Sequence, residues 1–124
     1  MFENYDTIYL MDMENIGKRY ISYFRNVKNA KLIMFLTYAV RGKNLQPQKE
    51  ANISIERIEC KEGYNQLDYQ LISYLGYFLN DWKDKKIVIM SSDTGYDVII
   101  NEIRKRGYRI FRIGNLEIKK GIYV

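Results

Sequence analysis

The chain has 124 residues, of which 47% are hydrophobic and 28% charged, with a net charge of +5. This size and balance are typical of one globular domain with a real core, and no apolar run approaches the ~20 residues that a membrane span needs. There is one cysteine, Cys60, and no histidine. These counts exclude an internal disulfide, a Cys/His zinc site and every catalytic triad that uses histidine. Hydrolytic chemistry would therefore depend on carboxylates, lysine or a bound metal.

The first half of the chain alternates short apolar runs with helical patterns. Residues 7–11 (TIYLM) predict a strand that is buried on both faces and ends at Asp12. Apolar residues then recur at helical spacing over residues 16–24, and residues 31–39 (KLIMFLTYA) predict a second buried strand. Three less regular stretches follow, which predict a loop, a short helix and a half-exposed strand at residues 41–44, 46–52 and 53–58.

The second half continues this alternation. Asn65 is a candidate cap for a long helix whose apolar stripe covers residues 67–78 and which ends near Asn80. Residues 86–90 (KIVIM) predict another fully buried strand, which leads through two serines to Asp93. The last predicted elements are a helix closed by a glycine, a strand, and a short strand or hairpin in the tail, at residues 98–107, 108–113 and 114–124.

Buried strands that alternate with helices imply an α/β fold, in which a mainly parallel sheet is covered on both faces. Ligands of such sheets bind outside the carboxyl ends of the strands, where the strand order switches direction. Asp12 and Asp93 both follow buried strands, so they are expected at this edge. Asp68, in the first turn of the long helix, and Asp97, at the start of the next helix, are expected to join them.

A cluster of aspartates is costly unless a cation neutralises it or its pKa values rise. Mg²⁺ and Mn²⁺ prefer oxygen ligands and take one or two carboxylates together with water. We therefore predict a Mg²⁺ or Mn²⁺ site with Asp12, Asp93, Asp68 and Asp97 as ligands, at which a metal-activated water would attack a phosphate. Glu14 is either a further ligand or a solvated side chain.

Each of these aspartates except Asp93 also has a purely structural interpretation. Asp12 can cap the following helix, a position for which Asn15 competes. Asp68 follows Asn65 by three residues, which is the spacing of a capping box. Asp97 lies where a negative charge is favoured by the helix dipole. For Asp93, in contrast, the neighbouring serine or threonine can take the capping position and leave the carboxylate free.

The positive net charge is compatible with a polyanionic partner. Arg41 and Lys43 follow the second strand, on the same edge as the acids, and are the predicted substrate-binding residues; the alternative is a solvated loop. Seven basic residues against two acids lie between Asn101 and the end of the chain. Twelve residues are tyrosines, and exposed ones could stack on nucleic-acid bases, although most are expected to pack with only the hydroxyl at the surface.

Three motifs in this order resemble the PIN-like nuclease superfamily, more particularly its NYN and bacterial PIN-like branch. The first is Asp12-Met13-Glu14-Asn15 at the end of a strand, and the second is Asn65-Gln66-Leu67-Asp68 at the start of a helix. The third is Ser91-Ser92-Asp93-Thr94-Gly95-Tyr96-Asp97, between a strand and a helix. The resemblance covers residues 7–113. It departs from many NYN-type members, which have a second acid where this chain has Gly95, with Asp97 two residues later.

The resemblance implies a three-layer α/β/α sandwich with Rossmann-like topology, formed as a single domain over residues 1–124. It implies an endoribonuclease that depends on Mg²⁺ or Mn²⁺ and hydrolyses phosphodiester bonds of single-stranded RNA. The acidic centre carries over to Asp12, Asp68, Asp93 and Asp97, with Asn15 as a polar helper. Separately, the first six residues carry acids in place of the basic start of a signal peptide, which predicts a cytoplasmic protein.

Two other phosphate-handling classes fit less well. A haloacid-dehalogenase-type enzyme would have an aspartate at the position of Glu14, and a receiver domain would have a phosphoacceptor aspartate near Cys60. The stronger alternative is a catalytically silent PIN-like module that binds RNA or a protein partner without cutting. A homodimer or a regulatory protein partner is compatible with the sequence. Metal binding and RNA cleavage discriminate between the enzyme and the silent module.

Overall fold

The centre of the molecule is a five-stranded sheet with the order β3-β2-β1-β4-β5, in which all neighbouring strands are parallel. The computed structural model describes residues 1–17, 20–37 and 52–124. The strands are β1 (Thr7–Asp12), β2 (Lys28–Leu36), β3 (Asn52–Glu59), β4 (Lys86–Met90) and β5 (Arg109–Ile113). The predicted parallel α/β sheet is confirmed.

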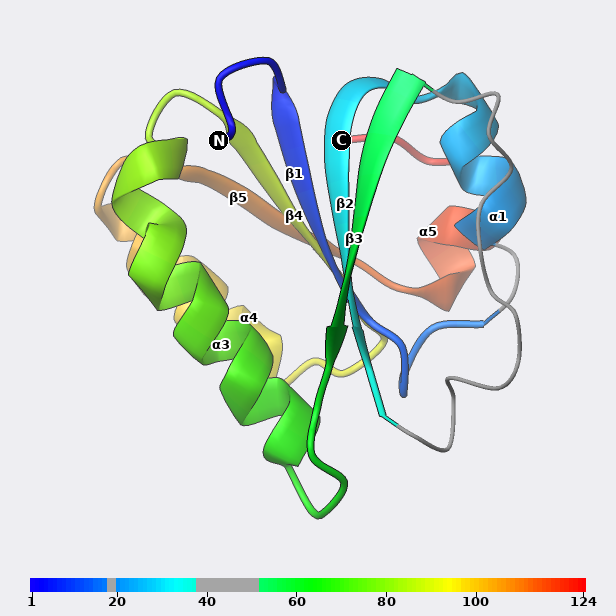
Figure 1. The fold of residues 1–124 in the computed structure, drawn as a ribbon, viewed down its shortest axis with the longest axis vertical. Helices are drawn as coiled ribbons and strands as arrows, with labels where there is room; N and C mark the ends of the chain where they lie inside the picture. The colour runs from blue at the N-terminus through cyan, green and yellow to red at the C-terminus, as the bar shows by residue number, and fades with distance from the viewer. Residues whose placement is uncertain (18–19, 38–51) are drawn as a thin grey trace.

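Helices cover both faces of the sheet, so the molecule has three layers (Figure 1). The long helices α3 (Gln66–Phe78) and α4 (Tyr96–Lys105) lie on one face, and the short helices α1 (Tyr20–Tyr23) and α5 (Asn115–Lys119) lie on the other. Two 3-10 turns, η1 (Phe24–Asn26) and η2 (Leu79–Trp82), continue α1 and α3. This is the α/β/α sandwich that the sequence predicts.

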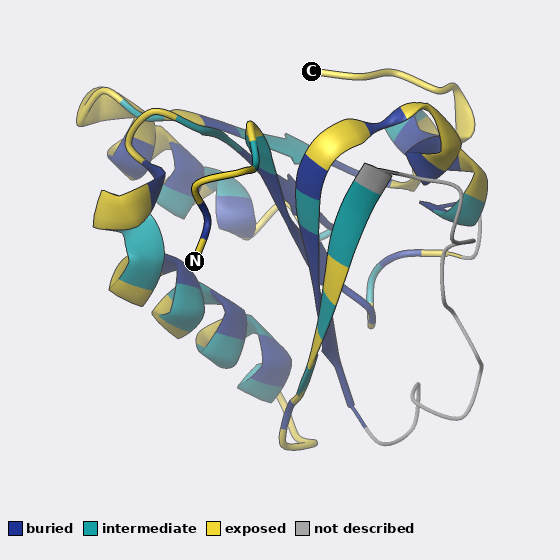
Figure 2. Ribbon diagram, turned by 45° about the horizontal axis from the view of Figure 1, so that its top comes forward, coloured by how far each residue is buried: buried dark blue, intermediate teal, exposed yellow. Residues whose placement is uncertain are grey.

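Alternate residues of the central strands supply two separate hydrophobic cores. Ile8 and Leu10 of β1 belong to the core beneath α3 and α4, while Tyr9 and Met11 belong to the core beneath α1 and α5. Figure 2 shows β1 and β4 buried along almost their whole length. Because both faces of these strands are covered, both faces require apolar side chains, and the strands appear in the sequence as continuous apolar runs.

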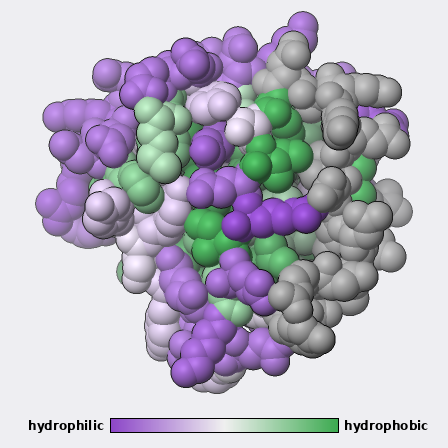
Figure 3. Space-filling view, viewed as in Figure 1, coloured by the Kyte–Doolittle hydropathy of each residue, from purple (hydrophilic) through white to green (hydrophobic). Residues whose placement is uncertain are grey.

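The edge strand β3 is less covered than the central strands. Ile55 is 38% exposed, and Ile53 and Ile58 are half-buried. Figure 3, in the view of Figure 1, shows apolar and hydrophilic side chains interspersed near the middle of this side of the molecule. This partial exposure explains why β3 alternates between apolar and polar residues in the sequence.

The structure shifts two predicted elements. The strand predicted over residues 31–39 begins earlier, at Lys28, and β2 ends at Leu36; the predicted end at Ala39 lies outside the described residues. The helix predicted over residues 16–24 is reduced to α1 and η1. Ile16 reaches the second core from a non-helical segment, so its burial does not require a helix.

The predicted strand or hairpin in the tail is wrong, because the short helix α5 occupies this segment. The backbone N–H of Gly114 donates a hydrogen bond to Glu117 Oε1 at 3.1 Å, which closes the first turn of α5. Ile118 is buried in the second core. The short helix predicted over residues 46–52 lies outside the described residues, except for Asn52, which begins β3. Within the described part of the chain, no helix is long and apolar enough to cross a membrane.

Candidate active site

The candidate site lies at the carboxyl edge of the sheet, between β1 and β4. From β1 the chain winds outward through β2 and β3, and it then crosses back to β4 and β5. Met11 pairs with Met90 at the carboxyl end of the two central strands, so Asp12 and Ser91 follow side by side. Asp93 lies on the turn after β4. Both aspartates that follow buried strands therefore lie at the switch point in strand order, where such sheets bind ligands.

Asp12 is a completely buried carboxylate, with a side chain held by four hydrogen-bond donors. It has 0% exposure. Its Oδ2 accepts from Asn15 Nδ2 (2.8 Å), Ser91 Oγ (2.9 Å) and the Tyr96 hydroxyl (3.4 Å), and its Oδ1 accepts from the backbone N–H of Glu14 (3.1 Å). A charge in the protein interior needs such donors in place of water. Asp12 caps no helix in the described residues, because α1 begins further along the chain.

The hydroxyl of Tyr96 lies between two of the acids. It is 3.4 Å from Asp12 Oδ2 and 3.2 Å from Asp68 Oδ1. A phenol has one proton, so it donates to one carboxylate at a time. Burial raises the pKa of this hydroxyl, and the charges of Asp12 and Asp68 raise it further. The protonated hydroxyl thus connects the end of β1 with the first turn of α3.

Asp68 approaches the site from the first turn of α3. Burial is the main cause that raises the pKa of this carboxyl, and the charge of Asp12 adds to it. The hydrogen bond from Tyr96 acts in the opposite direction, and the neighbouring Asp93 raises the pKa again. The capping-box alternative is not realised, because Asn65 has left-handed backbone angles (φ 59°) and its side chain makes no capping hydrogen bond. Asp68 therefore faces the acids rather than the end of its own helix.

Asp93 is half-buried on the turn between β4 and α4. Its Oδ1 accepts a hydrogen bond from the backbone N–H of Gly95 at 2.8 Å, and its own N–H donates to Ser91 Oγ at 3.0 Å. A Cβ atom on Gly95 would lie 3.0 Å from Asp93 Oδ1. Glycine at this position lets the backbone approach the carboxylate without that contact. The departure from the NYN-type motif at Gly95 thus has a local structural reason.

Asp97 is engaged differently from the other three aspartates. Its Oδ1 accepts a hydrogen bond from Arg112 Nε at 2.7 Å, and its Oδ2 accepts one from Arg112 Nη2 at 3.3 Å. Arg112 also donates from Nη1 to the carbonyl oxygen of Ser91 at 3.1 Å. Asp97 therefore joins the start of α4 to β5. Its role as a metal ligand remains a prediction.

The acidic environment extends to two glutamates. Burial raises the pKa of Glu14, and the charges of Asp12, Asp68 and Glu62 raise it as well. Glu62 was not among the residues predicted from the sequence; it lies in the segment between β3 and α3, which no motif covers. Burial, followed by the charges of Glu14 and Asp12, raises the pKa of Cys60 to about 11. The thiol of Cys60 is therefore protonated and does not act as a nucleophile.

An open pocket of ≈ 360 Å³ adjoins the acids. Asp68, Asp93 and Tyr96 line it, together with Tyr64, Asn65 and Tyr69. The acids therefore border a space that a ligand can enter from solvent, which is the arrangement expected of a binding site.

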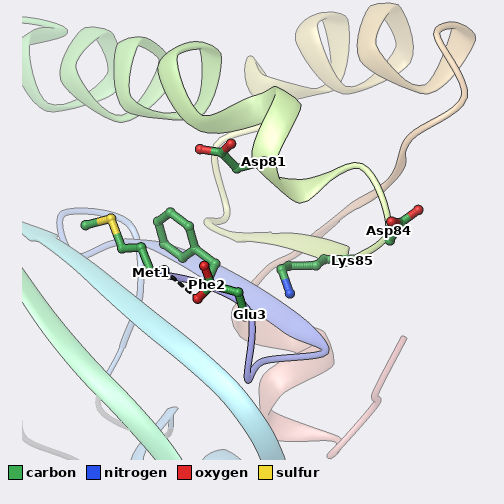
Figure 4. Close-up of a pocket in the computed structure, with 6 residues that line it drawn as sticks. All are labelled: Met1, Phe2, Glu3, Asp81, Asp84 and Lys85. Carbon is green, nitrogen blue, oxygen red and sulfur yellow. Dashed lines mark hydrogen bonds and ion pairs between the residues drawn. The ribbon is translucent and has the colours of Figure 1, made fainter.

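A different pocket, of ≈ 300 Å³, lies at the opposite edge of the sheet (Figure 4). Phe2 lines it and packs edge-on against the ring of Trp82 at 5.3 Å between centroids. Lys85, also in its lining, donates a hydrogen bond to the carbonyl oxygen of Tyr5 at 2.6 Å. These residues precede β1 and β4, so this pocket is remote from the acidic site at the carboxyl edge. The N-terminal segment forms part of its lining.

The basic residues of the C-terminal part divide between the two edges of the sheet, because Arg112 pairs with Asp97 beside the acidic site while others lie far from it. Lys105 and Arg106 lie at the end of α4, and Arg109 begins β5, which places all three at the amino edge of the sheet. The predicted substrate-binding residues Arg41 and Lys43 lie outside the described residues. Among the described residues, the carboxyl edge is rich in acids.

A protein-family comparison decides which family has this arrangement. The model of the PIN domain matches residues 6–113, which includes β1 to β5 and all four predicted aspartates. The chain belongs to the PIN domain family. The predicted resemblance is confirmed, and PIN domains are nuclease-type modules that typically use divalent metals. No curated protein matches this PIN domain, and no solved structure matches it.

The donor set of this PIN domain suits a hard divalent cation. Asp12, Asp68 and Asp93 offer only oxygen atoms, which Mg²⁺ and Mn²⁺ prefer. Asp12 Oδ1 accepts a single hydrogen bond from the described residues, which leave its second lone pair unused. No group of three or more acidic or cysteine side chains in the described part of the chain is arranged to hold a metal ion as it stands. Mg²⁺ commonly takes one or two carboxylates and completes its shell with water and substrate phosphate.

Proposed function

We propose that this PIN domain is a metal-dependent endoribonuclease that hydrolyses phosphodiester bonds of single-stranded RNA at the acidic site. Mg²⁺ or Mn²⁺ is the proposed cofactor, with Asp12, Asp68 and Asp93 as its proposed ligands and Asp97 as a fourth predicted one. The proposal also places the activity in the cytoplasm, as the sequence predicts. Membership of the PIN domain family supports a nuclease-type activity.

One observation carries the proposal. Three carboxylates from three separate segments of the chain, those of Asp12, Asp68 and Asp93, lie at this edge of the sheet. Asp68 and Asp93 line one pocket, and the Tyr96 hydroxyl connects Asp68 with the buried Asp12. None of the three forms an ion pair with a lysine or arginine of the described residues. Burial raises the pKa values of Asp68 and Glu14, and repulsion by the nearby charge of Asp12 raises them further. A fold that served structure alone would have little reason to gather unneutralised acids at a switch point.

The residues of the chain divide the proposed work. Asn15, Ser91 and Tyr96 hold Asp12 in one orientation through hydrogen bonds of 2.8, 2.9 and 3.4 Å. Asp93 and Asp68 border the open pocket, where a phosphate can reach them. A bound divalent cation would neutralise the acids, lower the pKa of a water and stabilise the charge that develops on the phosphate. The reaction adds water across one P–O bond and leaves a phosphate and a hydroxyl end.

The test uses single-stranded RNA with a fluorophore and a quencher, in the presence of Mn²⁺. Asp93→Asn should reduce the cleavage rate by at least about 100-fold, since it removes a ligand charge from the reaction centre. Asp12→Asn should reduce it similarly. Asp12 is buried among four donors, so we also expect this variant to lose about 1–3 kcal/mol of stability. The burial of Asp12 thus makes Asp93→Asn the cleaner of the two variants.

Asp81→Asn is the matched control, because Asp81 is an exposed acid beside the pocket at the opposite edge of the sheet. It should cleave RNA like the wild type. Cleavage that persists in EDTA and in both site variants would contradict the proposal. A wild-type protein that neither binds Mn²⁺ nor cuts RNA would instead be the silent module that binds RNA or a protein partner.

A further inference from the structure

Two tyrosines next to the acidic site are exposed to an unusual degree. Tyr64 is 91% exposed and Tyr69 is 58% exposed, whereas most aromatic residues of the described chain pack into the two cores. Neither hydroxyl has a hydrogen-bond partner among the described residues, and neither ring contacts another ring there. Both residues line the pocket that Asp68 and Asp93 border. Two free aromatic faces therefore stand beside the acids.

A polar group accompanies the two rings. Asn65 lines the same pocket, has left-handed backbone angles (φ 59°) and makes no capping hydrogen bond with its side chain. Asparagine tolerates this backbone conformation better than most residues. Its amide group carries two donors and an acceptor that no described residue uses. Ile72 adds an apolar side chain to the lining.

We infer that this pocket is a nucleobase subsite, in which an unpaired base stacks on Tyr64 or Tyr69 while the amide of Asn65 hydrogen-bonds to its edge. The inference rests on the proposed function, which places the scissile phosphate at Asp93 and Asp68. The nucleotide next to that phosphate would then put its base into the pocket. Aromatic rings bind bases by stacking, and an amide can bond to a base edge.

The subsite selects against a double helix. A base inside a duplex has both faces covered by its neighbours and its pairing edge occupied, so it cannot stack on a tyrosine. The pocket volume of ≈ 360 Å³ is at the lower end of the range of ligand sites, as expected for one base. The occupant is therefore an unpaired base, which the proposed function assigns to single-stranded RNA.

The test measures binding of fluorescein-labelled single-stranded RNA by anisotropy in EDTA, so that binding is read without cleavage. Replacing the tyrosine that stacks, by Tyr64→Ala or Tyr69→Ala, should weaken binding by about 5- to 150-fold. The alanine variant of the other tyrosine should show a smaller loss. Tyr64→Phe and Tyr69→Phe keep the ring and should bind like the wild type. Tyr77→Ala is the control, because Tyr77 is 80% exposed on α3, the helix that carries Tyr69, but does not line the pocket.

An RNA of the same length with abasic sites should bind weakly to the wild type, and Tyr64→Ala should not weaken it further. Asn65→Gly removes the amide while tolerating the left-handed backbone, and it should reduce the preference among the four homopolymer RNAs. Thermal unfolding should be the same for these surface variants as for the wild type.

The inference is overturned if both alanine variants bind RNA as tightly as the wild type, if abasic RNA binds as well as normal RNA, or if the wild type binds no RNA. The proposed function fails separately, on cleavage. A protein that stacks bases without cutting keeps the subsite and loses the nuclease activity. A protein that cuts RNA equally well with Tyr64 and Tyr69 replaced keeps the nuclease activity and loses the subsite.

Discussion

At the residue scale, the acids differ in how the chain holds them. Asp12 is buried and surrounded by donors, whereas Asp68 and Asp93 are only half-buried and border the open pocket. The donors around Asp12 keep its charge in one place. Asp68 accepts a hydrogen bond from the Tyr96 hydroxyl, a donor that it shares with Asp12. The free-energy cost of keeping the clustered carboxyls ionised is therefore clearest at Asp68, which has fewer donors than Asp12 among the described residues.

This cost predicts a pH dependence of stability. The pKa of Asp68 is raised in the folded protein above its usual value of 3.8. Asp68 therefore contributes stability that is fully present below pH 3.8 and is lost as the pH rises through the raised pKa. Asp68→Asn removes this loss, so in EDTA at neutral pH it should unfold at a higher temperature than the wild type. The difference should shrink as the pH falls toward about 4.

Thermal unfolding in EDTA across this pH range measures the effect. Glu14, with a raised pKa of the same cause, contributes in the same direction, so Asp68→Asn reduces the slope without abolishing it. Asp81→Asn, at the other edge of the sheet, should follow the wild-type curve. Parallel curves for the wild type and Asp68→Asn would show that the fold does not raise the pKa of Asp68.

At the scale of elements, the Asp97–Arg112 ion pair connects α4 with β5, and Arg112 also binds the carbonyl oxygen of Ser91 after β4. The pair is partly buried, with 19% exposure for the arginine side chain and 47% for the aspartate. Such a pair contributes little beyond about 0.5–1 kcal/mol. Its main effect is to keep the start of α4 in register with the strands that support Asp93.

If this pairing is its whole role, Asp97→Asn should lose about 0.5–1 kcal/mol of stability and reduce RNA cleavage much less than Asp93→Asn does. A double-mutant cycle with Arg112→Ala measures the interaction by urea unfolding. The double variant should lose less stability than the sum of the two single losses, because each substitution removes the same contact. A loss of cleavage in Asp97→Asn as large as in Asp93→Asn would instead make Asp97 a ligand.

The elements also differ in how well the sequence predicts them. The strands β1 and β4 are covered on both faces and have continuous apolar runs, so they are predicted correctly. The helix α5 has five residues, which are too few to show a repeating helical pattern of apolar residues. Its position is fixed by Ile118, which is buried in the second core. Its prediction failed for that reason. The helix over residues 16–24 is overpredicted because burial of Ile16 does not need helical backbone.

At the scale of the whole molecule, the crossover from β3 back to β4 brings the acids together. A divalent cation that binds this cluster in the folded state, and not in the unfolded chain, stabilises the fold by linkage. We expect Mn²⁺ at about 100 times its dissociation constant to stabilise the wild type by about 2.7 kcal/mol. Differential scanning calorimetry with Mn²⁺ and with EDTA measures this shift.

Asp93→Asn should show little or no shift, while Asp81→Asn should shift like the wild type, because Asp81 lies away from the cluster. An equal shift for all three proteins would mean that the ion binds elsewhere. The same experiment in RNA-free buffer separates metal binding from cleavage.

The sequence by itself determined which residues end the buried strands, because an apolar run covered on both faces is a local pattern that any reader of the chain can locate. It thereby identified Asp12 and Asp93, the parallel sheet and the edge at which we propose that a ligand binds. Only the tertiary structure decided the neighbours. Tyr96 lies between Asp12 and Asp68, and Arg112 holds Asp97, because the crossovers bring together segments that are far apart in the chain. A contact between distant segments produces no local pattern in the sequence, so it can be identified only from the fold.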